Sequence, residues 1–480
     1  MTPRTKRVVL VGAGHTHALF LQSLVETPLI KKCVVEQPLV YRPGSQQQTI
    51  QKPTAQKFSQ QQPSDQSQQA HHQFVNNPFQ NIEILLISPL SLAPYSGMIP
   101  GWLAGQYEFN ETVVDFDVLC KRVGAKWIKA EMLGLDPDAQ TINLSTGETL
   151  SYDWLSINVG STLRPPEALV PNVLALRPLW TLRQRYNAYL ESWLQDHNPE
   201  PLTVTTVGAG AAGVESLLCI LQRLRSLRPN RLVQGRLISR SADILPGFSA
   251  QAKRLAHKAL NDAQITIQCN ADWQNIIAVS HHELSSNESD NDDSSTDLVI
   301  WATGAQAHSW QLDPTRRLTL QVSADGFIQV DNTLRSISHP NIFATGDCAN
   351  LPSSLPKAGV YAVRMADTLI VNLRVAVNSE VGLSHHKQRS GQTHEVLQVN
   401  SAHRSSEADK PNRLGQVNQV DPSNHTDMFK PFKTKPYALA LLNTGDGCAI
   451  ASWRFFGMSG KLIWKLKDYI DRRFVNRFSN

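Results

Sequence analysis

Short apolar runs rich in β-branched residues alternate along the chain with longer stretches in which apolar residues recur at helical spacing. Several of the short runs are apolar throughout, which is typical of strands buried on both faces of a parallel sheet. Strands that alternate with helices predict an α/β protein built from doubly wound parallel sheets. The runs interpreted as strands are Arg7–Val11, Glu83–Ser88, Leu202–Val207, Arg236–Ser239, Asp297–Ala302 and Asn341–Ala344.

Three polar stretches interrupt this pattern. Residues 42–80 are rich in Gln, Ser and Pro, residues 285–296 in Ser, Asn and Asp, and residues 376–430 in Ser, His, Asn and Gln. These stretches lack the apolar surface that would offset the entropy of ordering, so we expect disordered insertions. Removing them leaves roughly 370 residues, which suits two α/β domains and a C-terminal piece.

Composition and charge narrow the class of protein. The 480 residues are 41% hydrophobic and 18% charged, as in ordinary globular proteins. The net charge is only +5 and the basic residues are spread along the chain, which argues against a nucleic-acid partner. No two of the six cysteines form a close pair, so we expect reduced thiols in the cytoplasm and no metal site. The run Val8–Val11 is too short for a signal peptide, and no run of about 18 apolar residues predicts a membrane span.

A first glycine turn, Gly12-Ala13-Gly14-His15-Thr16-His17, follows a predicted strand and precedes a helical stretch. In this setting Gly12 would permit a tight turn, and Gly14 would let the backbone approach a pyrophosphate at the helix N-terminus. His17 stands where a third glycine is usual. It either fits between helix and strand or points at the ligand. Ser88 ends the next strand, where an acidic residue normally binds the ribose.

A second turn, Gly208-Ala209-Gly210-Ala211-Ala212-Gly213, has all three glycines. Two such turns in one chain indicate two dinucleotide sites far more specifically than either turn alone. The strand after the second turn ends without an acidic residue, and Arg236 and Arg240 lie nearby. This pattern favours the 2′-phosphate of NADPH, although the two arginines could also be simply solvated.

A closing motif, Ala344-Thr345-Gly346-Asp347, follows another predicted strand, and Ala302-Thr303-Gly304 follows a further one. The Asp347 carboxylate can accept a hydrogen bond from the ribityl hydroxyls of a flavin. The N-terminus of the helix that follows would face phosphates.

With these motifs the sequence resembles the pyridine nucleotide–disulfide oxidoreductase superfamily, whose members bind FAD and NAD(P)H on two Rossmann-like domains. The resemblance implies an FAD domain at residues 1–170 and 311–375 and an NAD(P) domain at residues 171–310. It also implies a C-terminal α+β region at residues 431–480. Disulfide reductases of this superfamily carry a redox cysteine pair, and this chain has none in the matching region, Tyr95–Gly101. The spacing of its cysteines does not match the catalytic cysteines of sulfide:quinone reductases either. The sequence is therefore more similar to type II NADH dehydrogenase-like proteins.

Within that group the chain looks like the flavoprotein found fused ahead of selenophosphate synthetase, although any link to selenium metabolism stays open. The motifs that carry this likeness are Gly12–His17, Pro94–Gly101, Leu355–Arg364 and Trp464–Phe474. The resemblance places the Tyr95–Gly101 segment beside the isoalloxazine. Type II dehydrogenases carry glutamines where this chain has Gly359, Val363 and Arg364, so a quinone acceptor is plausible but not carried over residue by residue.

The resemblance implies a ping-pong reaction in which NAD(P)H reduces FAD and FAD then reduces an acceptor. The Lys357 ammonium could stabilise negative charge on the reduced flavin, or it could be an ordinary surface lysine. Tyr95 is the second catalytic candidate. The residues assigned to cofactor binding are Gly12, Gly14, His15, His17, Ser88, Ser96, Gly97, Gly160, Gly208, Gly210, Gly213, Arg240, Gly304, Gly346 and Asp347.

The C-terminus predicts an amphipathic helix with a basic face. Its expected apolar stripe is Ile463, Leu466, Ile470 and Phe474. Such a helix lies on an anionic membrane, packs on the body, or forms a homodimer interface. Two functions are consistent with the sequence as a whole: an NAD(P)H:acceptor oxidoreductase, or a flavin-binding regulatory or scaffold protein with little turnover. The intact second glycine turn favours the enzyme.

Overall fold

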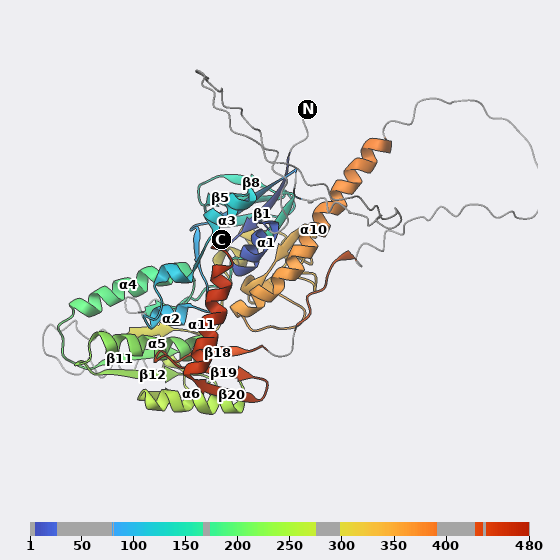
Figure 1. Ribbon diagram of the computed structural model, residues 1–480. Coiled ribbons are helices and arrows are strands. Elements are labelled where there is room, and N and C mark those ends of the chain that lie inside the picture. The colour runs from blue at the N-terminus through green and yellow to red at the C-terminus, as the bar shows by residue number, and fades with distance from the viewer. Residues whose placement is uncertain are drawn as a thin grey trace, which may run out of the picture.

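The protein is built around two five-stranded parallel sheets (Figure 1). The structure is a computed structural model, and it describes residues 5–25, 79, 81–166, 173–274, 298–390, 428–434 and 438–479. The first sheet has the order β16-β9-β1-β2-β5, and every neighbouring pair is parallel. Its strands are β1 (Lys6–Val11), β2 (Ile82–Ser88), β5 (Lys126–Lys129), β9 (Trp154–Ile157) and β16 (Ile342–Ala344).

The second sheet has the order β10-β14-β11-β12-β13 and is also parallel throughout. All its strands fall between β9 and β16 along the chain, so a second α/β unit is inserted into the first. This arrangement confirms the predicted class of two Rossmann-like units, one interrupting the other. The strands of this sheet are β10 (Val173–Ala175), β11 (Leu202–Val207), β12 (Val233–Ile238), β13 (Ile265–Gln268) and β14 (Leu298–Trp301).

Helices and small antiparallel sheets surround the two parallel sheets. The helix α1 (His15–Val25) follows β1 and packs on α10 (Gly359–Ser390), while α5 (Ala211–Leu227) follows β11. At the C-terminus, β18 (Ala440–Asn443), β19 (Ala449–Trp453) and β20 (Phe456–Gly460) form an antiparallel sheet against α11 (Lys461–Asn476). The remaining elements are β3 (Leu92–Pro94), α2 (Ile99–Leu103), η1 (Phe109–Thr112), β4 (Val113–Asp115), α3 (Phe116–Val123), β6 (Met132–Asp136), β7 (Thr141–Leu144), β8 (Thr149–Ser151), α4 (Leu179–Gln195), α6 (Ala250–Asp262), α8 (Ser309–Leu312), α9 (Pro314–Arg317), β15 (Ile328–Gln329), η3 (Gly346–Cys348) and β17 (Ala349–Asn350).

All six runs interpreted as strands from the sequence are strands in the structure, with ends that differ by a few residues at most. The strand β9, which lies between β1 and β16 in the first sheet, was not expected from the sequence. Its sequence, Trp-Leu-Ser-Ile, places the polar Ser156 in a fully buried strand. This serine is tolerated because its hydroxyl has a hydrogen-bond partner in His17.

The predicted insertion at residues 376–430 is wrong at its start, because α10 continues as helix to Ser390. Ala376 and Val377 are buried, so the apolar face of α10 extends past the predicted boundary. At the other end, Lys430 N–H donates to the Asn372 side chain (2.7 Å), which holds that residue against α10. Residues 391–427, the predicted insertion at 285–296 and nearly all of the one at 42–80 lie outside the described residues.

The predicted apolar stripe of the C-terminal helix is split in the structure. Phe474 is buried, but Leu466 and Ile470 are exposed, while the polar Lys467 and Asp471 face inward. Burial of this pair is possible because Lys467 Nζ and Asp471 Oδ2 lie 2.7 Å apart and compensate each other. Within the described ranges, no helix combines the length and apolarity needed to cross a bilayer.

Candidate functional site

The first glycine turn lies where the strand order of the first sheet reverses, with β2 on one side of β1 and β9 on the other. Ligands of doubly wound sheets bind in the crevice at this point. Gly12 has φ +96°, and a Cβ there would stand 2.5 Å from the Asn158 carbonyl oxygen. Only glycine fits, because both the backbone angle and the close approach exclude a side chain.

Asn158, directly after β9, ties this turn to the closing motif and was missed by the sequence analysis. Its Oδ1 accepts from the Thr16 N–H (3.2 Å), and its Nδ2 donates to the Thr345 carbonyl (2.8 Å). The side chain therefore sets the spacing between the two turns that face the same cavity. The only signal in the sequence was Asn-Val-Gly at the end of an apolar run that contains a serine.

His17 lies beneath the turn and does not line the cavity. Its Nδ1 is 2.7 Å from the Gly12 carbonyl oxygen and its Nε2 is 2.8 Å from the Ser156 hydroxyl. Burial lowers the pKa of His17 to about 4, so the ring is neutral, with Nδ1–H donating and Nε2 accepting. Of the two alternatives left by the sequence, His17 takes the place between helix and strand.

A cavity of about 500 Å³ lies beside the first turn. Its volume is in the range of small-molecule sites. The Ser88 hydroxyl at its edge donates to the Leu90 carbonyl (2.8 Å) and keeps its oxygen as an acceptor. Seven of the residues assigned to cofactor or catalytic roles line this cavity: Gly12, Gly14, His15, Ser88, Ser96, Gly160 and Asp347. Gly346 lines only a small neighbouring cavity that shares Asp347.

An arginine that the sequence analysis did not single out reaches Asp347. Arg177 follows β10, and its Nη1 is 2.6 Å from Asp347 Oδ2. The Ser161 hydroxyl donates to the same oxygen (3.1 Å) and is also hydrogen-bonded to Arg177. Arg177 Nη2 donates to the Lys357 carbonyl (3.0 Å). The cation beside the closing motif therefore comes from the first segment of the inserted unit.

Lys357 points away from the main cavity. Its ammonium donates to the Ala349 carbonyl (2.6 Å) and lies 3.8 Å from the centre of the Phe327 ring. Burial lowers the pKa of Lys357. The side chain lines only the small cavity next to Asp347. The Lys357 side chain therefore contacts Ala349 and Phe327 and does not line the cavity beside the first turn.

Tyr95 stacks on Phe474 of α11, with ring centres 4.3 Å apart. His15 meets both rings edge-on, at 5.2 Å from Tyr95 and 5.7 Å from Phe474. Burial raises the pKa of Tyr95, which keeps the phenol protonated, and lowers the pKa of His15 to about 4. The C-terminal helix therefore supplies an aromatic support behind the His15 wall of the cavity, while Tyr95 and Gly97 lie behind that wall.

The second glycine turn lies at the corresponding switch point of the second sheet, between β11 and β14. Gly208 has φ +111°, and a Cβ there would meet the Ala302 carbonyl oxygen at 2.3 Å. Gly210 and Gly304 face open space. Gly213 packs on the turn itself, and Arg240 is exposed just beyond β12.

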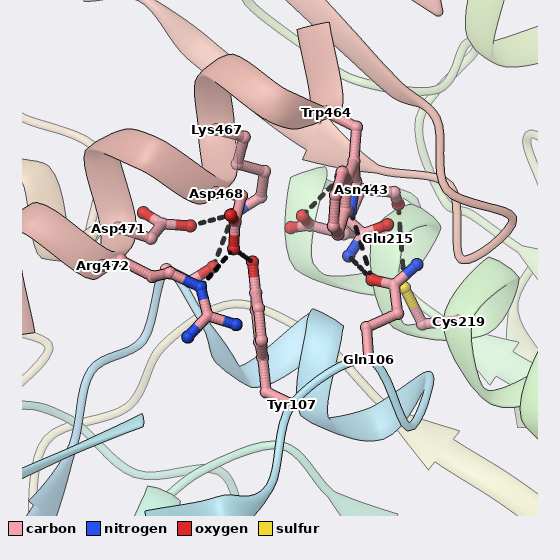
Figure 2. Close-up of polar contacts among 11 residues, drawn as sticks. Gln106, Tyr107, Glu215, Cys219, Asn443, Trp464, Lys467, Asp468, Asp471 and Arg472 are labelled. Carbon is pink, nitrogen blue, oxygen red and sulfur yellow. Dashed lines mark hydrogen bonds and ion pairs between the residues drawn. The ribbon is translucent and has the colours of Figure 1, made fainter. Parts of the chain in front are cut away.

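The inserted unit, the first unit and the C-terminal region meet in a network of buried and half-buried polar side chains, which we call the polar junction (Figure 2). Lys467 of α11 donates to the Gly97 carbonyl and pairs with Asp471. Gln106 Oε1 accepts from Asn443 Nδ2 (2.7 Å) and from the Trp464 indole (3.3 Å). The residues labelled at the junction are Gln106, Tyr107, Glu215, Cys219, Asn443, Trp464, Lys467, Asp468, Asp471 and Arg472.

Glu215, two residues after the last glycine of the second turn, faces this junction from α5. Its Oε1 accepts from the Asn443 N–H (2.6 Å). Burial raises the pKa of Glu215 to about 7, although the nearby Lys467 opposes this rise. No role for Glu215 was expected from the sequence. A carboxyl that titrates near neutral pH is a feature of functional sites as well as of structural networks.

The first cavity fits a dinucleotide such as FAD. Gly12 and Gly14 line the cavity without a side chain, and α1 begins at His15 with its N-terminus at the cavity edge. Asp347 offers Oδ1 as a free acceptor among the described residues, because both of its donors engage Oδ2. Within the described part of the chain, Cys120, Cys219, Cys269, Cys348 and Cys448 are all free thiols.

A sequence model of the family described as pyridine nucleotide-disulphide oxidoreductase matches residues 69–366. The alternative NAD(P)H-ubiquinone oxidoreductase C1, chloroplastic/mitochondrial, of Arabidopsis thaliana is 26% identical over 343 residues, which are 65% of this chain and 64% of that protein. An NADH dehydrogenase-like protein of Mycobacterium tuberculosis is 27% identical over 242 residues, 47% of this chain and 56% of that protein. The chain thus spans less than two thirds of the length of these curated relatives.

Solved structures share the fold at low sequence identity. The sulfide:quinone oxidoreductase of Aquifex aeolicus superposes with a TM-score of 0.60 at 13% identity, covering 98% of this chain and 91% of that chain. NDH2 from Plasmodium falciparum, solved in complex with NADH, gives a TM-score of 0.57 at 15% identity, covering 99% and 97%.

We predict that Glu215→Gln changes how stability depends on pH. Between pH 4.5 and about 7 the folded carboxyl keeps a proton that the unfolded chain releases, so the free energy of unfolding falls as pH rises through this window. A pKa rise from 4.5 to about 7 corresponds to about 3 kcal/mol. Denaturant titrations at several pH values should show this component in the wild type and not in the variant.

The control for that measurement is Glu191→Gln, which removes an exposed carboxylate from α4. Titrations at saturating FAD keep ligand binding constant across the series. Parallel pH curves for the wild type and Glu215→Gln would show that the junction holds Glu215 ionised, against this prediction.

Proposed function

The chain belongs to the pyridine nucleotide-disulphide oxidoreductase family, whose members use FAD and a nicotinamide nucleotide, and on that premise we propose that it is an FAD-dependent NAD(P)H oxidoreductase that passes electrons to a quinone-type acceptor. The observation that carries the proposal is the pair of glycine turns at equivalent switch points of two parallel sheets. A flavin scaffold with little turnover would not need the second turn.

In the proposed FAD site, the Gly12–Gly14 turn and the N-terminus of α1 hold the pyrophosphate. Ser88 and Gly160 line the same cavity, and Asp347 offers Oδ1 to a ribityl hydroxyl. Bound FAD supplies the chemistry of accepting a hydride from NAD(P)H and giving electrons to an acceptor. His15 stays neutral at this wall because burial keeps its pKa low.

For the nicotinamide nucleotide we propose the turn at Gly208, Gly210 and Gly213, with Gly304 at the adjacent strand end. Arg240 is proposed to bind a 2′-phosphate, because it is exposed beyond β12 and no acidic residue ends that strand. Glu215, which follows this turn within α5, then connects the proposed nucleotide site to the polar junction.

The acceptor is proposed by class. A relative in Arabidopsis thaliana is named for ubiquinone, which supports a quinone. The start of α10 carries Gly359, Val363 and Arg364, none of which is a glutamine. Catalytic roles for Tyr95 and Lys357 are supported by the family resemblance alone, because neither residue lines the main cavity. A selenium compound is a further candidate acceptor, from the likeness to the flavoprotein fused to selenophosphate synthetase.

We also propose that the protein is cytoplasmic and touches a membrane surface through its C-terminal region. Phe455 and Leu462 are each 79% exposed, and Phe456, Met458 and Tyr469 lie open beside them. The concentration of exposed large apolar residues in this one segment is the kind of surface that marks an interaction site. The basic residues interspersed with it are Arg454, Lys461, Lys465 and Arg473. Such a surface suits an anionic bilayer, and a second copy of the chain in a homodimer is the alternative occupant.

The decisive test of the function is anaerobic reduction. Purified protein should be yellow with bound FAD, and NADPH or NADH should bleach it without oxygen. Gly210→Glu is the matched variant, because Gly210 has open space around it and the new carboxylate would repel the pyrophosphate. We expect this variant to keep FAD and to be bleached by dithionite but not by NAD(P)H.

A colourless wild-type protein would contradict the proposed reaction. So would a yellow wild-type protein that dithionite bleaches and NAD(P)H does not. Reoxidation of the reduced wild-type protein with quinones, oxygen and selenium compounds then ranks the acceptors. Reduction without reoxidation by any of these would favour the scaffold.

Nucleotide preference is tested by Arg240→Ala. Loss of a charge-assisted contact with the 2′-phosphate should lower kcat/KM for NADPH by roughly 10- to 100-fold and leave NADH turnover unchanged. Arg254→Ala removes an exposed arginine from α6 as the control. An NADH-preferring wild type whose kinetics do not respond to Arg240→Ala would exclude this role.

Membrane contact is tested with Leu462→Glu combined with Leu466→Glu, at two exposed positions of α11. Burying each leucine in lipid contributes about 1.5–3 kcal/mol, so co-sedimentation with anionic vesicles should fall at least tenfold. Leu194→Glu is the control, since Leu194 is equally apolar and exposed on α4. A wild type that ignores vesicles but loses dimerisation in the double variant would assign the patch to a second copy.

A further inference from the structure

Arg177 lies beside the proposed FAD site, and the role inferred for it rests on that proposal. Arg177 belongs to the segment in which the chain enters the inserted unit, between β10 and α4. Its guanidinium turns back to the first unit, where it contacts three separate segments. These are Ser161 after β9, Asp347 in the closing motif and the carbonyl of Lys357 before α10.

The pairing with Asp347 is close and partly shielded. Arg177 Nη1 lies 2.6 Å from Asp347 Oδ2, and the side chains are 26% and 13% exposed. Shielded pairs are sensitive to the loss of one partner, because the other charge is left without compensation. Lys357, the other cation nearby, turns its ammonium to the Ala349 carbonyl. Arg177 is therefore the residue that compensates Asp347.

The contacts also fix which oxygen of Asp347 faces a ligand. Arg177 and Ser161 both engage Oδ2, and no described residue donates to Oδ1. A carboxylate can accept on both oxygens, so Oδ1 stays available toward the cavity that Asp347 lines. A planar guanidinium that reaches two neighbouring acceptors with two nitrogens holds this orientation better than a single ammonium would.

We propose that Arg177 is a positioning residue for the flavin site. It aims Asp347 Oδ1 at the ribityl chain, and its charge offsets the negative charge of Asp347 beside the cofactor. Arg177 lies at the start of the inserted unit, and it contacts Asp347 of the first unit. The same side chain therefore links FAD binding to the point at which the inserted unit is attached.

Two properties of bound FAD should depend on this side chain. Without Arg177, the rotamer of Asp347 is less restricted, so FAD should dissociate more readily. An uncompensated carboxylate beside the flavin also disfavours added electrons, so the midpoint potential should become more negative. A purely structural role would lower thermal stability without moving the potential of the FAD that remains bound.

The experiment compares Arg177→Gln, Arg177→Lys and the control Arg185→Gln, an exposed arginine on α4. We expect Arg177→Gln to raise the dissociation constant for FAD about tenfold and to shift the midpoint potential to more negative values. Arg177→Lys should keep a potential near that of the wild type, because the charge remains, but should bind FAD less tightly. Arg185→Gln should match the wild type in both measurements.

A double variant shows whether Arg177 acts through Asp347. Arg177→Gln combined with Asp347→Asn should lose no more FAD affinity than the weaker-binding single variant, because both changes remove one interaction. Additive losses, or an unchanged potential in Arg177→Gln, would overturn the proposal. A wild-type protein without FAD would instead contradict the proposed function, so the two failures are distinguishable.

Discussion

The position of the C-terminal helix depends on one buried cation. Lys467 is 6% exposed, and its ammonium is compensated by Asp471 and by the Gly97 carbonyl. A buried charge without such partners would cost several kcal/mol, so these contacts favour the observed position of α11 on the first unit. That position brings Phe474 onto Tyr95 and so supports the His15 wall of the cavity. The same cation lies within electrostatic reach of Glu215, which follows the second glycine turn. The proposed FAD site and the proposed nicotinamide nucleotide site are thus both connected to the polar junction (Figure 2).

The two glycine turns solve the same packing problem with different residues. In the second turn, Gly213 lets α5 lie directly on the backbone, where a Cβ would stand 1.9 Å from the Gly208 carbonyl oxygen. In the first turn, His17 occupies the equivalent position and uses both ring nitrogens, one on the Gly12 carbonyl and one on Ser156. The imidazole replaces close contact by two hydrogen bonds. A departure from a motif can therefore be a complete alternative when a neighbouring strand carries the matching polar residue.

The sequence predicted the fold class and the location of both turns, because buried parallel strands are apolar throughout and glycine turns have fixed spacing. It did not predict Arg177 or Asn158, since each acts on residues more than a hundred positions away and neither belongs to a recognisable motif. The expected face of the C-terminal helix failed for a related reason. Helical periodicity predicts that Lys467 and Asp471 are exposed to solvent. They can be buried because they pair with each other and Lys467 donates to the Gly97 carbonyl. For Lys357 the sequence left two alternatives, a cation beside the flavin or a surface lysine, and in the structure its ammonium donates to the Ala349 carbonyl.

The route by which the chain enters and leaves the inserted unit has a consequence for its modular character. The two crossings lie side by side: Thr162 and Gln306 exchange backbone hydrogen bonds of 2.9 Å, and Arg164 donates to the Ala307 carbonyl. The two ends of the inserted unit therefore lie close together, as in a domain that can be inserted into a loop of another domain. A graft of this kind would still have to carry Arg177, because that one side chain belongs to the insert by sequence and to the host by its contacts. The backbone therefore separates the two units clearly, whereas the side-chain contacts of Arg177 cross the boundary between them.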